Sequence, residues 1–241
     1  MLGAALRSAT PSERPYALSA HDLENMIDEA STVAPEAHGT TDPSPDDGGL
    51  GERAARTRSL ILKAAQQLFL DRGYSGTRIN NITDACGISR AGFYTYFKDK
   101  REVFNLLGEE SYRDILATVT RWDDIPHPAS RADVERWVTE YFAFMDVHGA
   151  FIFSSAQSAP PDEDFRESSK RLQMRVAWLL GVNLRNRQTE PTEAPEALGL
   201  AVMAMLDRSW YQSRVQRLPV DDGDMIATVA AMIRSTIRTN D

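Results

Sequence analysis

The sequence TRINNITDACGISRAGFYTYFKDK, residues 77–100, carries the clearest structural signal in this chain of 241 residues. A short helix is predicted from about Ile79 to Ala85, followed by a tight turn that contains Gly87 and by a second helix that opens at Ser89. A glycine tolerates the positive φ that such a turn requires. A serine hydroxyl accepts a hydrogen bond from a free backbone N–H of the first helical turn. The pattern predicts a helix-turn-helix.

The two predicted helices have distinct inner and outer faces. Apolar side chains fall on the inward faces, namely Ile79, Ile82, Ile88, Phe93 and Phe97. The outward positions carry side chains whose donors suit phosphate oxygens and guanine edges, and these are Arg90, Tyr94, Thr95, Tyr96, Lys98 and Lys100. Thr77 is placed to cap the first helix and to contact a phosphate at once. For Tyr96, packing against the helix over residues 60–73 is the alternative to a phosphate contact.

The run SRAGFYTYF at residues 89–97, followed by Lys100, resembles the recognition-helix signature of tetracycline-repressor (TetR) family regulators. Residues 60–73 and the start of the helix-turn-helix are similar to the first two helices of that family, and the similarity covers roughly residues 53–107. One departure is Thr83, where the family usually places alanine. Its hydroxyl is expected to bond back to the carbonyl four residues earlier.

The resemblance implies which side chains contact DNA. The positions of Arg90 and Ala91 approach base edges in the family, while those of Tyr94, Tyr96 and Lys100 hold phosphates. The N-terminal part of a recognition helix enters the major groove, where small residues permit close approach. Lys100 also lies in the first turn of a further helix, whose positive end suits a phosphate. The predicted DNA-binding residues are Thr77, Arg78, Asn80, Ser89, Arg90, Ala91, Gly92, Tyr94, Thr95, Tyr96 and Lys100.

The charge of the chain is unevenly distributed. The net charge of −8 argues against nucleic acid as a partner until it is divided by segment. Residues 1–52 carry two Lys/Arg against ten Asp/Glu, residues 53–107 carry ten against four, and residues 108–241 carry fifteen against twenty-one. The positive charge is therefore concentrated on the helix-turn-helix segment, as expected of a phosphate-binding surface.

Composition divides the chain into three parts. Residues 1–52 are rich in Pro, Gly, Ser and Asp, and we expect a disordered acidic arm there. An internal translation start at Met26 is one alternative, and an acidic tail that competes with DNA is another. Residues 53–107 form the predicted DNA-binding domain, and residues 108–241 form the predicted effector-binding and dimerisation domain.

The C-terminal part shows helical periodicity without any alternating strand pattern. Helices are predicted from Lys98–Asp99 towards Val119, and over about 131–148, 163–187, 195–217 and 221–239. The predicted fold is therefore all-α, with a three-helix DNA-binding domain followed by a helical bundle. The last two helices carry abundant apolar residues, and the family resemblance places the dimer contact there. The sequence thus predicts that Ile233 lies at the centre of a homodimer interface.

An aromatic- and Met-rich set marks the C-terminal half. Plain core packing explains any single member, but together these residues are abundant enough to line an apolar cavity between helices. The family resemblance implies an effector pocket in this region. The predicted ligand-binding residues are Trp137, Tyr141, Phe142, Met145, Phe153, Met174 and Trp178.

No pattern points to a metal, a cofactor or an enzyme. The four histidines lack ligand spacing, and neither a glycine-rich phosphate loop nor GxSxG occurs. One cysteine excludes an internal disulfide, which fits a reducing cytoplasm. The start of the chain does not resemble a signal peptide. The sequence therefore predicts a cytoplasmic, homodimeric repressor that a small apolar or amphipathic effector releases from a palindromic operator. The alternative is a helical small-molecule-binding or enzymatic protein that no longer binds DNA.

Overall fold

The computed structural model describes residues 47–158 and 163–237 of the chain. Most of the predicted disordered arm, residues 1–46, therefore lies outside the described residues. Residues 47–52 were assigned to the same arm, but they belong to the first described helix. The chain divides into two units, residues 1–51 and 52–241, and nearly all of the described residues belong to the second.

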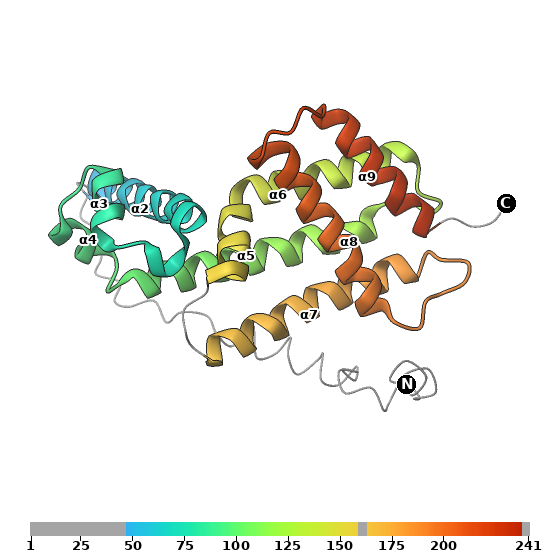
Figure 1. Ribbon diagram of the computed structural model, residues 1–241, viewed down its shortest axis with the longest axis horizontal. Coiled ribbons are helices and arrows are strands. Elements are labelled where there is room, and N and C mark those ends of the chain that lie inside the picture. The colour runs from blue at the N-terminus through green and yellow to red at the C-terminus, as the bar shows by residue number, and fades with distance from the viewer. Residues whose placement is uncertain (1–46, 159–162, 238–241) are drawn as a thin grey trace. The chain divides into compact units, whose positions relative to one another are not determined.

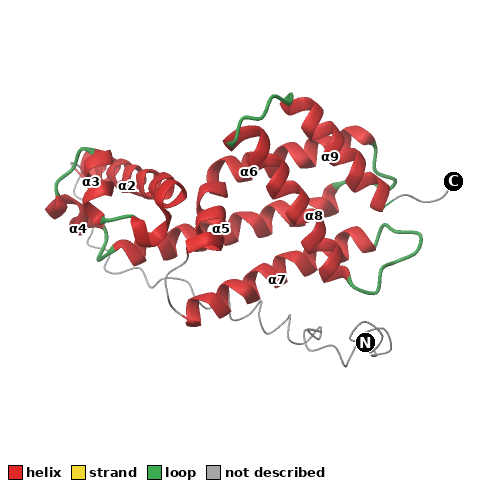
Figure 2. Cartoon of the chain, in the orientation of Figure 1, coloured by secondary structure: helices red, strands yellow, loops and turns green. Residues whose placement is uncertain are grey.

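Helices follow one another along this unit (Figure 1), and no strand occurs within residues 47–158 and 163–237 (Figure 2). The all-α prediction is therefore confirmed. No helix of the described residues combines the length and apolar character needed to span a bilayer. The elements are α2 Asp47–Gly76, α3 Ile79–Cys86, α4 Arg90–Tyr96, α5 Lys100–Thr120, a 3-10 turn Arg121–Asp124, α6 Arg131–Ser158, α7 Glu163–Arg185, α8 Pro195–Trp210, a π-helical turn Tyr211–Val215 and α9 Asp222–Thr236.

Two helix boundaries in the C-terminal part differ clearly from the sequence-based prediction. Helix α6 does not stop near His148 but runs on to Ser158, because its apolar run around Phe151 is buried against neighbouring helices and nothing breaks the helix. Helix α8 ends at Trp210 and passes into a wider π-helical turn, instead of continuing regularly to residue 217. Helix α5 runs without a break from Lys100 to Thr120, as the sequence predicts.

Helices α2 to α4 and the start of α5 enclose one apolar core. It contains Ile61, Phe69, Ile82, Phe93, Phe97 and Phe104, all at most 2% exposed. These residues come from every helix of the segment, so the position of α4 is fixed by packing against the other three. The Thr83 hydroxyl donates to the carbonyl of Asn80 at 3.0 Å, three residues earlier, so the expected bond to the carbonyl four residues earlier is wrong.

The C-terminal helices enclose a second core. Helix α7 packs along α8, and α9 packs along α6 (Figure 1). The backbones of α7 and α8 nearly touch at Gly181 and Gly199, where an added Cβ would lie 1.7 Å from a carbonyl oxygen of the facing helix. Large side chains fill the remainder of the core, including Trp122, Trp137, Tyr141, Phe142, Leu180 and Leu206.

Helix α6 contributes to both cores. Its Phe151 ring packs on Phe104 of α5 at a centroid distance of 4.9 Å and belongs to the N-terminal core. The next residue, Ile152, packs against both cores. On the same helix, the indole of Trp210 lies against Gly149 so closely that a Cβ there would be 2.3 Å from the ring. One short stretch of α6 therefore touches α5 on one side and the end of α8 on the other.

Candidate nucleic-acid interface and effector core

The turn between α3 and α4 has the geometry that the sequence predicts. Gly87 has φ 66° and ψ 31°, a left-handed conformation that glycine adopts without strain. The Ile88 N–H donates to the carbonyl of Thr83 at 3.1 Å. At the start of α4, the Gly92 N–H donates to the Ser89 hydroxyl at 3.0 Å. The predicted N-cap of the second helix is therefore confirmed.

One face of α4 is open to solvent. Arg90, Ala91, Tyr94 and Thr95 are all exposed, and their spacing of i, i+1, i+4 and i+5 places them on a single helix face. The Arg90 guanidinium donates to the Tyr94 hydroxyl at 3.4 Å. The Tyr94 ring rests edge-on against buried Phe93 at 5.6 Å. The exposed face therefore presents a guanidinium and a phenol held next to each other.

The remaining residues that the sequence predicts to contact DNA differ in how exposed they are. Arg78, Asn80 and Ser89 are exposed, whereas Gly92 and Tyr96 are half-buried. Tyr96 packs against the N-terminal core, which favours the packing role over the phosphate contact for this residue.

Thr77 is fully buried, and its hydroxyl is directed into the protein. It donates towards the carbonyls of Leu68 at 3.0 Å and Gly73 at 2.9 Å. The N-cap residue of α3 is Arg78, whose backbone N–H donates to the Asn81 side chain at 2.9 Å. The prediction that Thr77 caps this helix is therefore wrong. Its hydroxyl instead fixes the connection between α2 and α3.

Lys100 also binds within the protein. Its ammonium donates to the carbonyls of Tyr74 at 2.6 Å and Thr77 at 2.8 Å, and it lies 4.1 Å from the centre of the Tyr74 ring. Burial lowers the pKa of the Lys100 ammonium below its ordinary value. The lysine thus ties the start of α5 to the α2–α3 connection, with two of its three N–H groups engaged. Sequence analysis missed this role because the acceptors lie 23 and 26 residues away.

A hollow of about 390 Å³ lies beside this lysine. The first turns of α3 and α5 both contribute to its lining, and the N–H groups of a helix start attract anions. The lining carries three basic side chains and one acidic one, so the hollow suits a negatively charged group. It is formed by Tyr74, Ser75, Thr77, Arg78, Ile79, Asp99, Lys100 and Arg101. Ser75 and Arg101 were not among the predicted residues.

The predicted effector-binding residues fall into two groups that differ in burial. Trp137, Tyr141, Phe142 and Met145 are at most 2% exposed and belong to the C-terminal core. Phe153 is half-buried and stacks on the rings of Trp210 and Tyr211 at 6.0 and 4.5 Å. Met174 and Trp178 are half-buried on α7. The first four therefore act as packing residues in this conformation, and the last three border the surface.

A partly buried acid lies next to the aromatic core. The Tyr141 hydroxyl donates to the Asp207 carboxylate at 2.8 Å, which joins α6 to α8. Enclosure by the protein raises the pKa of Asp207 from 3.8 to about 6, although the hydrogen bond from Tyr141 opposes this rise. Sequence analysis missed Asp207 because an acid within an apolar helix gives no sign of its partner 66 residues away.

His148 and Cys86 have local partners. His148 is buried, and its Nε2 lies 2.7 Å from an Asp114 carboxylate oxygen on α5. The Cys86 thiol donates to the carbonyl of Leu60 at 3.5 Å, and burial raises its pKa. Across residues 47–158 and 163–237, no three His, Cys, Asp or Glu side chains gather as a metal site would require.

The Lys100 contacts predict that this lysine stabilises the fold through its hydrogen bonds, and that the effect is distinct from the loss of one surface charge. Lys100→Met should lower the stability of the folded chain by on the order of 2 kcal/mol, because two carbonyls lose a charged donor. The melting temperature, followed by circular dichroism, should fall by several degrees. Lys98→Met removes the same positive charge from an exposed neighbouring position, and it should leave the melting temperature nearly unchanged. Equal effects of the two substitutions would contradict the structural role.

The raised pKa of Asp207 predicts that the difference in stability between the Asp207→Asn variant and the native chain depends on pH. An acid whose pKa is higher in the folded state than in the unfolded chain favours folding when protonated, and loses that contribution as the pH rises from about 4 through about 6. Asp207→Asn removes the ionisation but keeps an acceptor for Tyr141. The stability of the variant relative to the native chain should be greatest near pH 7 and should decline towards pH 4. Urea unfolding at a series of pH values measures this difference, and a pH-independent difference would contradict it.

Comparison with known proteins identifies the same segment. Residues 61–107 match the model of bacterial regulatory proteins of the tetR family. The HTH-type transcriptional repressor BepR of Brucella suis is 35% identical over 78 residues, which cover 31% of this chain and 37% of that protein. The HTH-type transcriptional repressor DhaR of a Mycobacterium species is 32% identical over 113 residues, which cover 46% of this chain and 57% of that protein.

The fold is shared over a greater length than the sequence. The TetR-family regulator PfmR from Thermus thermophilus superposes with a TM-score of 0.58 at 19% identity, over 74% of this chain and 99% of that one. By contrast, the chain spans only 37%, 30% and 48% of the lengths of three curated relatives that it matches in sequence. Residues 61–107 therefore match the family of bacterial regulatory proteins named tetR, and the described chain shares its fold with a solved regulator of that family.

Proposed function

We propose that this protein is a sequence-specific DNA-binding transcriptional regulator, a repressor that a small effector releases from a palindromic operator. The observation that carries the proposal is the exposed face of α4, where Arg90 and Tyr94 stand together on a helix-turn-helix. Arginine binds guanine edges with two hydrogen bonds, and a phenol donates to phosphate. Small Ala91 between them allows the helix to approach the floor of the major groove.

Two further features support DNA as the partner. The segment over residues 53–107 carries the positive charge of an otherwise acidic chain. The hollow between α3 and α5 offers Arg78 and Arg101 to a backbone phosphate next to the one that α4 would contact. BepR and DhaR, which share this segment, are both named transcriptional repressors. The alternative, a helical protein without DNA binding, gives no reason for the exposed Arg90 and Tyr94. Operator binding also implies that the protein acts in the cytoplasm.

Effector release requires a link between the C-terminal core and the DNA-binding head. Helix α6 supplies a physical route, since Phe151 packs in the head and Gly149 receives the ring of Trp210 from α8. A ligand that binds beside Phe153 and favours another position of α6 must weaken DNA binding by the same coupling free energy. We place the effector next to Phe153, Met174 and Trp178, with the buried aromatic residues behind it.

The proposed homodimer uses α8 and α9, but not through the residues that the sequence singled out. Ile233 is fully buried in the core of its own chain, as are Val202, Leu206 and Val229. Most of the large apolar side chains of these helices therefore pack on one internal face, and the prediction that Ile233 lies at the centre of the interface is wrong.

A different face of the same helices is available for a partner. Helix α8 exposes Ala197, Ala201, Ala204 and Arg208, and α9 exposes Thr228, Ala231, Met232 and Ser235. Met232 is 52% exposed, which is unusual for a large apolar side chain. Small side chains allow helices to approach closely across a two-fold axis. A dimer through this face would carry two recognition helices, as a palindromic operator requires.

The DNA-binding proposal predicts an enriched palindrome. Selection of bound sequences from random duplex DNA should return a two-fold symmetric site whose affinity falls steeply with added salt. Arg90→Ala should weaken binding unevenly across single-base variants of that site, by about 1–3 kcal/mol at the contacted position, while Tyr94→Phe should weaken it nearly uniformly. Absence of an enriched palindrome would overturn the proposal. Sequence-independent losses in both variants would remove base recognition from Arg90.

The dimer proposal predicts opposite outcomes for two neighbouring substitutions. Met232→Asp should leave the helix content and melting temperature of the chain nearly unchanged but give a monomer in sedimentation velocity, with a large loss of operator affinity. Ile233→Asp should unfold the chain, because it buries an unpaired charge in the core. A Met232→Asp protein that still sediments as a dimer would move the interface to another face.

A further inference from the structure

Helix α2 begins well before the N-terminal core. It starts at Asp47, whereas the match to the tetR family begins at Ile61, which is also fully buried. Within residues 51–60, only Ala54 and Thr57 are half-buried, and the others are exposed. Helices in proteins are stabilised mainly by packing of an apolar face, and residues 52–60 pack little of their surface. The apolar core therefore does not explain why the helix extends this far.

The projecting segment, residues 52–60, is basic. It carries Arg53, Arg56 and Arg58 against one acid, Glu52, and all four are exposed. One nitrogen of Arg56 lies 3.8 Å from a Glu52 oxygen, with 76% and 78% of the two side chains exposed. An ion pair at such exposure contributes little free energy and yields readily to a stronger partner. The arginines are therefore available to a partner of opposite charge.

Two contacts place this segment beside the helix-turn-helix. The Arg58 guanidinium lies 5.5 Å from the centre of the Phe97 ring, and Phe97 directly follows α4. The Leu60 carbonyl accepts a hydrogen bond from the thiol of Cys86, the last residue of α3. Figure 1 shows the same arrangement, with the start of α2 next to α3 and α4. The projecting turns therefore begin at the side of the head that carries α3 and α4.

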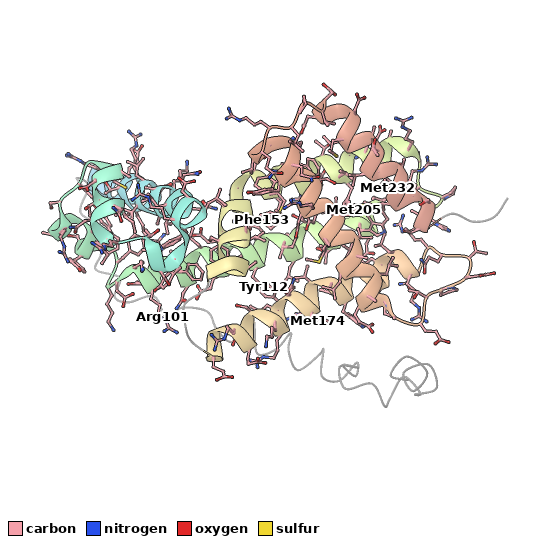
Figure 3. The ribbon with its side chains drawn as sticks, in the orientation of Figure 1. Arg101, Tyr112, Phe153, Met174, Met205 and Met232 are labelled. Carbon is pink, nitrogen blue, oxygen red and sulfur yellow. The ribbon has the colours of Figure 1, made fainter. Side chains whose placement is uncertain are left out.

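Positive charge lies at both ends of α2. The far end of the helix lines the basic hollow together with Arg101, which Figure 3 labels at the start of α5. About 27 Å of helix separates Arg56 from Tyr74 of that hollow, at a rise of about 1.5 Å per residue. Helix α4 packs through Phe93 and Phe97 in the core that the intervening part of α2 helps to form. Basic groups therefore flank α4 at both ends of the helix that supports it.

We propose that residues 52–60 form a second DNA contact, in which Arg53 and Arg56 bind backbone phosphates next to the groove that α4 enters. The two arginines are three residues apart, so they are neighbours on one helix face. The helix rises about 4.5 Å between them, and the phosphates of one strand follow each other about every 3.4 Å of DNA axis. Both side chains can therefore reach the same strand, each with two parallel N–H groups for phosphate oxygens.

The third arginine holds the segment in place. Arg58 rests on Phe97 and so fixes the projecting turns to the end of α4. The position beside α4 favours DNA over any other anionic partner. This contact rests on the proposed function, because it extends the DNA-binding surface of that function beyond the helix-turn-helix. Since phosphates carry no sequence information, the contact strengthens binding without changing base preference.

The salt dependence of DNA binding tests the contact in the full-length protein. The probe is the palindromic duplex that the native chain selects, and its binding constant is measured over a series of salt concentrations. Each phosphate contact contributes about 0.9 to the slope of log K against log salt. Arg53→Gln/Arg56→Gln should therefore lower the slope by about two per protomer, and reduce affinity at low salt by at least about tenfold.

The same double variant should keep the native order of affinities across single-base variants of the duplex. An unchanged slope would overturn the proposal, and so would losses confined to particular base pairs.

Two matched double variants separate phosphate binding from net charge. Arg171→Gln/Arg185→Gln removes the same charge from exposed positions on α7, and it should leave the slope unchanged. Arg53→Lys/Arg56→Lys keeps both charges and should retain most of the native slope. All three double variants should melt at the native temperature, because every replaced residue is exposed. Equal slope losses in the α7 variant, or in the lysine variant, would overturn the contact.

These measurements distinguish failure of the contact from failure of the proposed function. A native chain that selects no palindrome is not a sequence-specific regulator, yet its salt-dependent binding to a random-sequence duplex still reports on Arg53 and Arg56. A native chain that selects a palindrome, with an unchanged slope in the glutamine variant, remains a regulator that binds DNA without residues 52–60.

Discussion

The ammonium of Lys100 holds together the part of the molecule on which the proposed DNA recognition depends. From the first turn of α5, it donates to the carbonyl of Tyr74 at the end of α2 and to the carbonyl of Thr77 just before α3. The end of α2, the start of α3 and the start of α5 therefore meet at one charge. The Thr77 hydroxyl secures the same connection from within. Because α4 packs on these helices through Phe93 and Phe97, the exposed face of α4 is oriented by bonds that lie far from the face itself.

The second constraint is the dual role of α6. A helix that ended near His148 would lack the Phe151 contact and would join the N-terminal core to the C-terminal core through α5 and the bond from Gln66 to the Val147 carbonyl. The continuous helix carries Phe151 into the head and sets Gly149 against Trp210. The Trp210 indole also donates to Asp146 at 2.8 Å, and Arg214 pairs with both Asp146 and Asp222 at the start of α9. A shift of α6 is therefore opposed by polar bonds at Asp146 and by ring packing at Gly149 and Phe151, all within two turns of the helix.

Polar groups enclosed in the C-terminal domain have different physical roles. The pair of Tyr141 and Asp207 is satisfied within the protein, and its main consequence is a carboxyl group that ionises near pH 6. Tyr112 of α5 and Arg175 of α7 also interact within the protein: burial raises the pKa of the Tyr112 phenol, and the nearby Arg175 guanidinium offsets part of that rise.

The sequence by itself determined the helix-turn-helix, the helical class and the exposed side chains of α4, because capping residues, glycine at the turn and apolar periodicity act within a few residues of one another. It also indicated where positive charge gathers. Only the tertiary structure decided which apolar residues face inward on a helix that has two candidate faces. It shows Ile233 in the core of its own chain, where the sequence had predicted a dimer interface. It likewise gave Lys100 and Thr77 their carbonyl partners and brought Tyr112 and Arg175 together across 63 positions of sequence. Local signals carry no information about such distant partners, since only packing brings them within bonding distance.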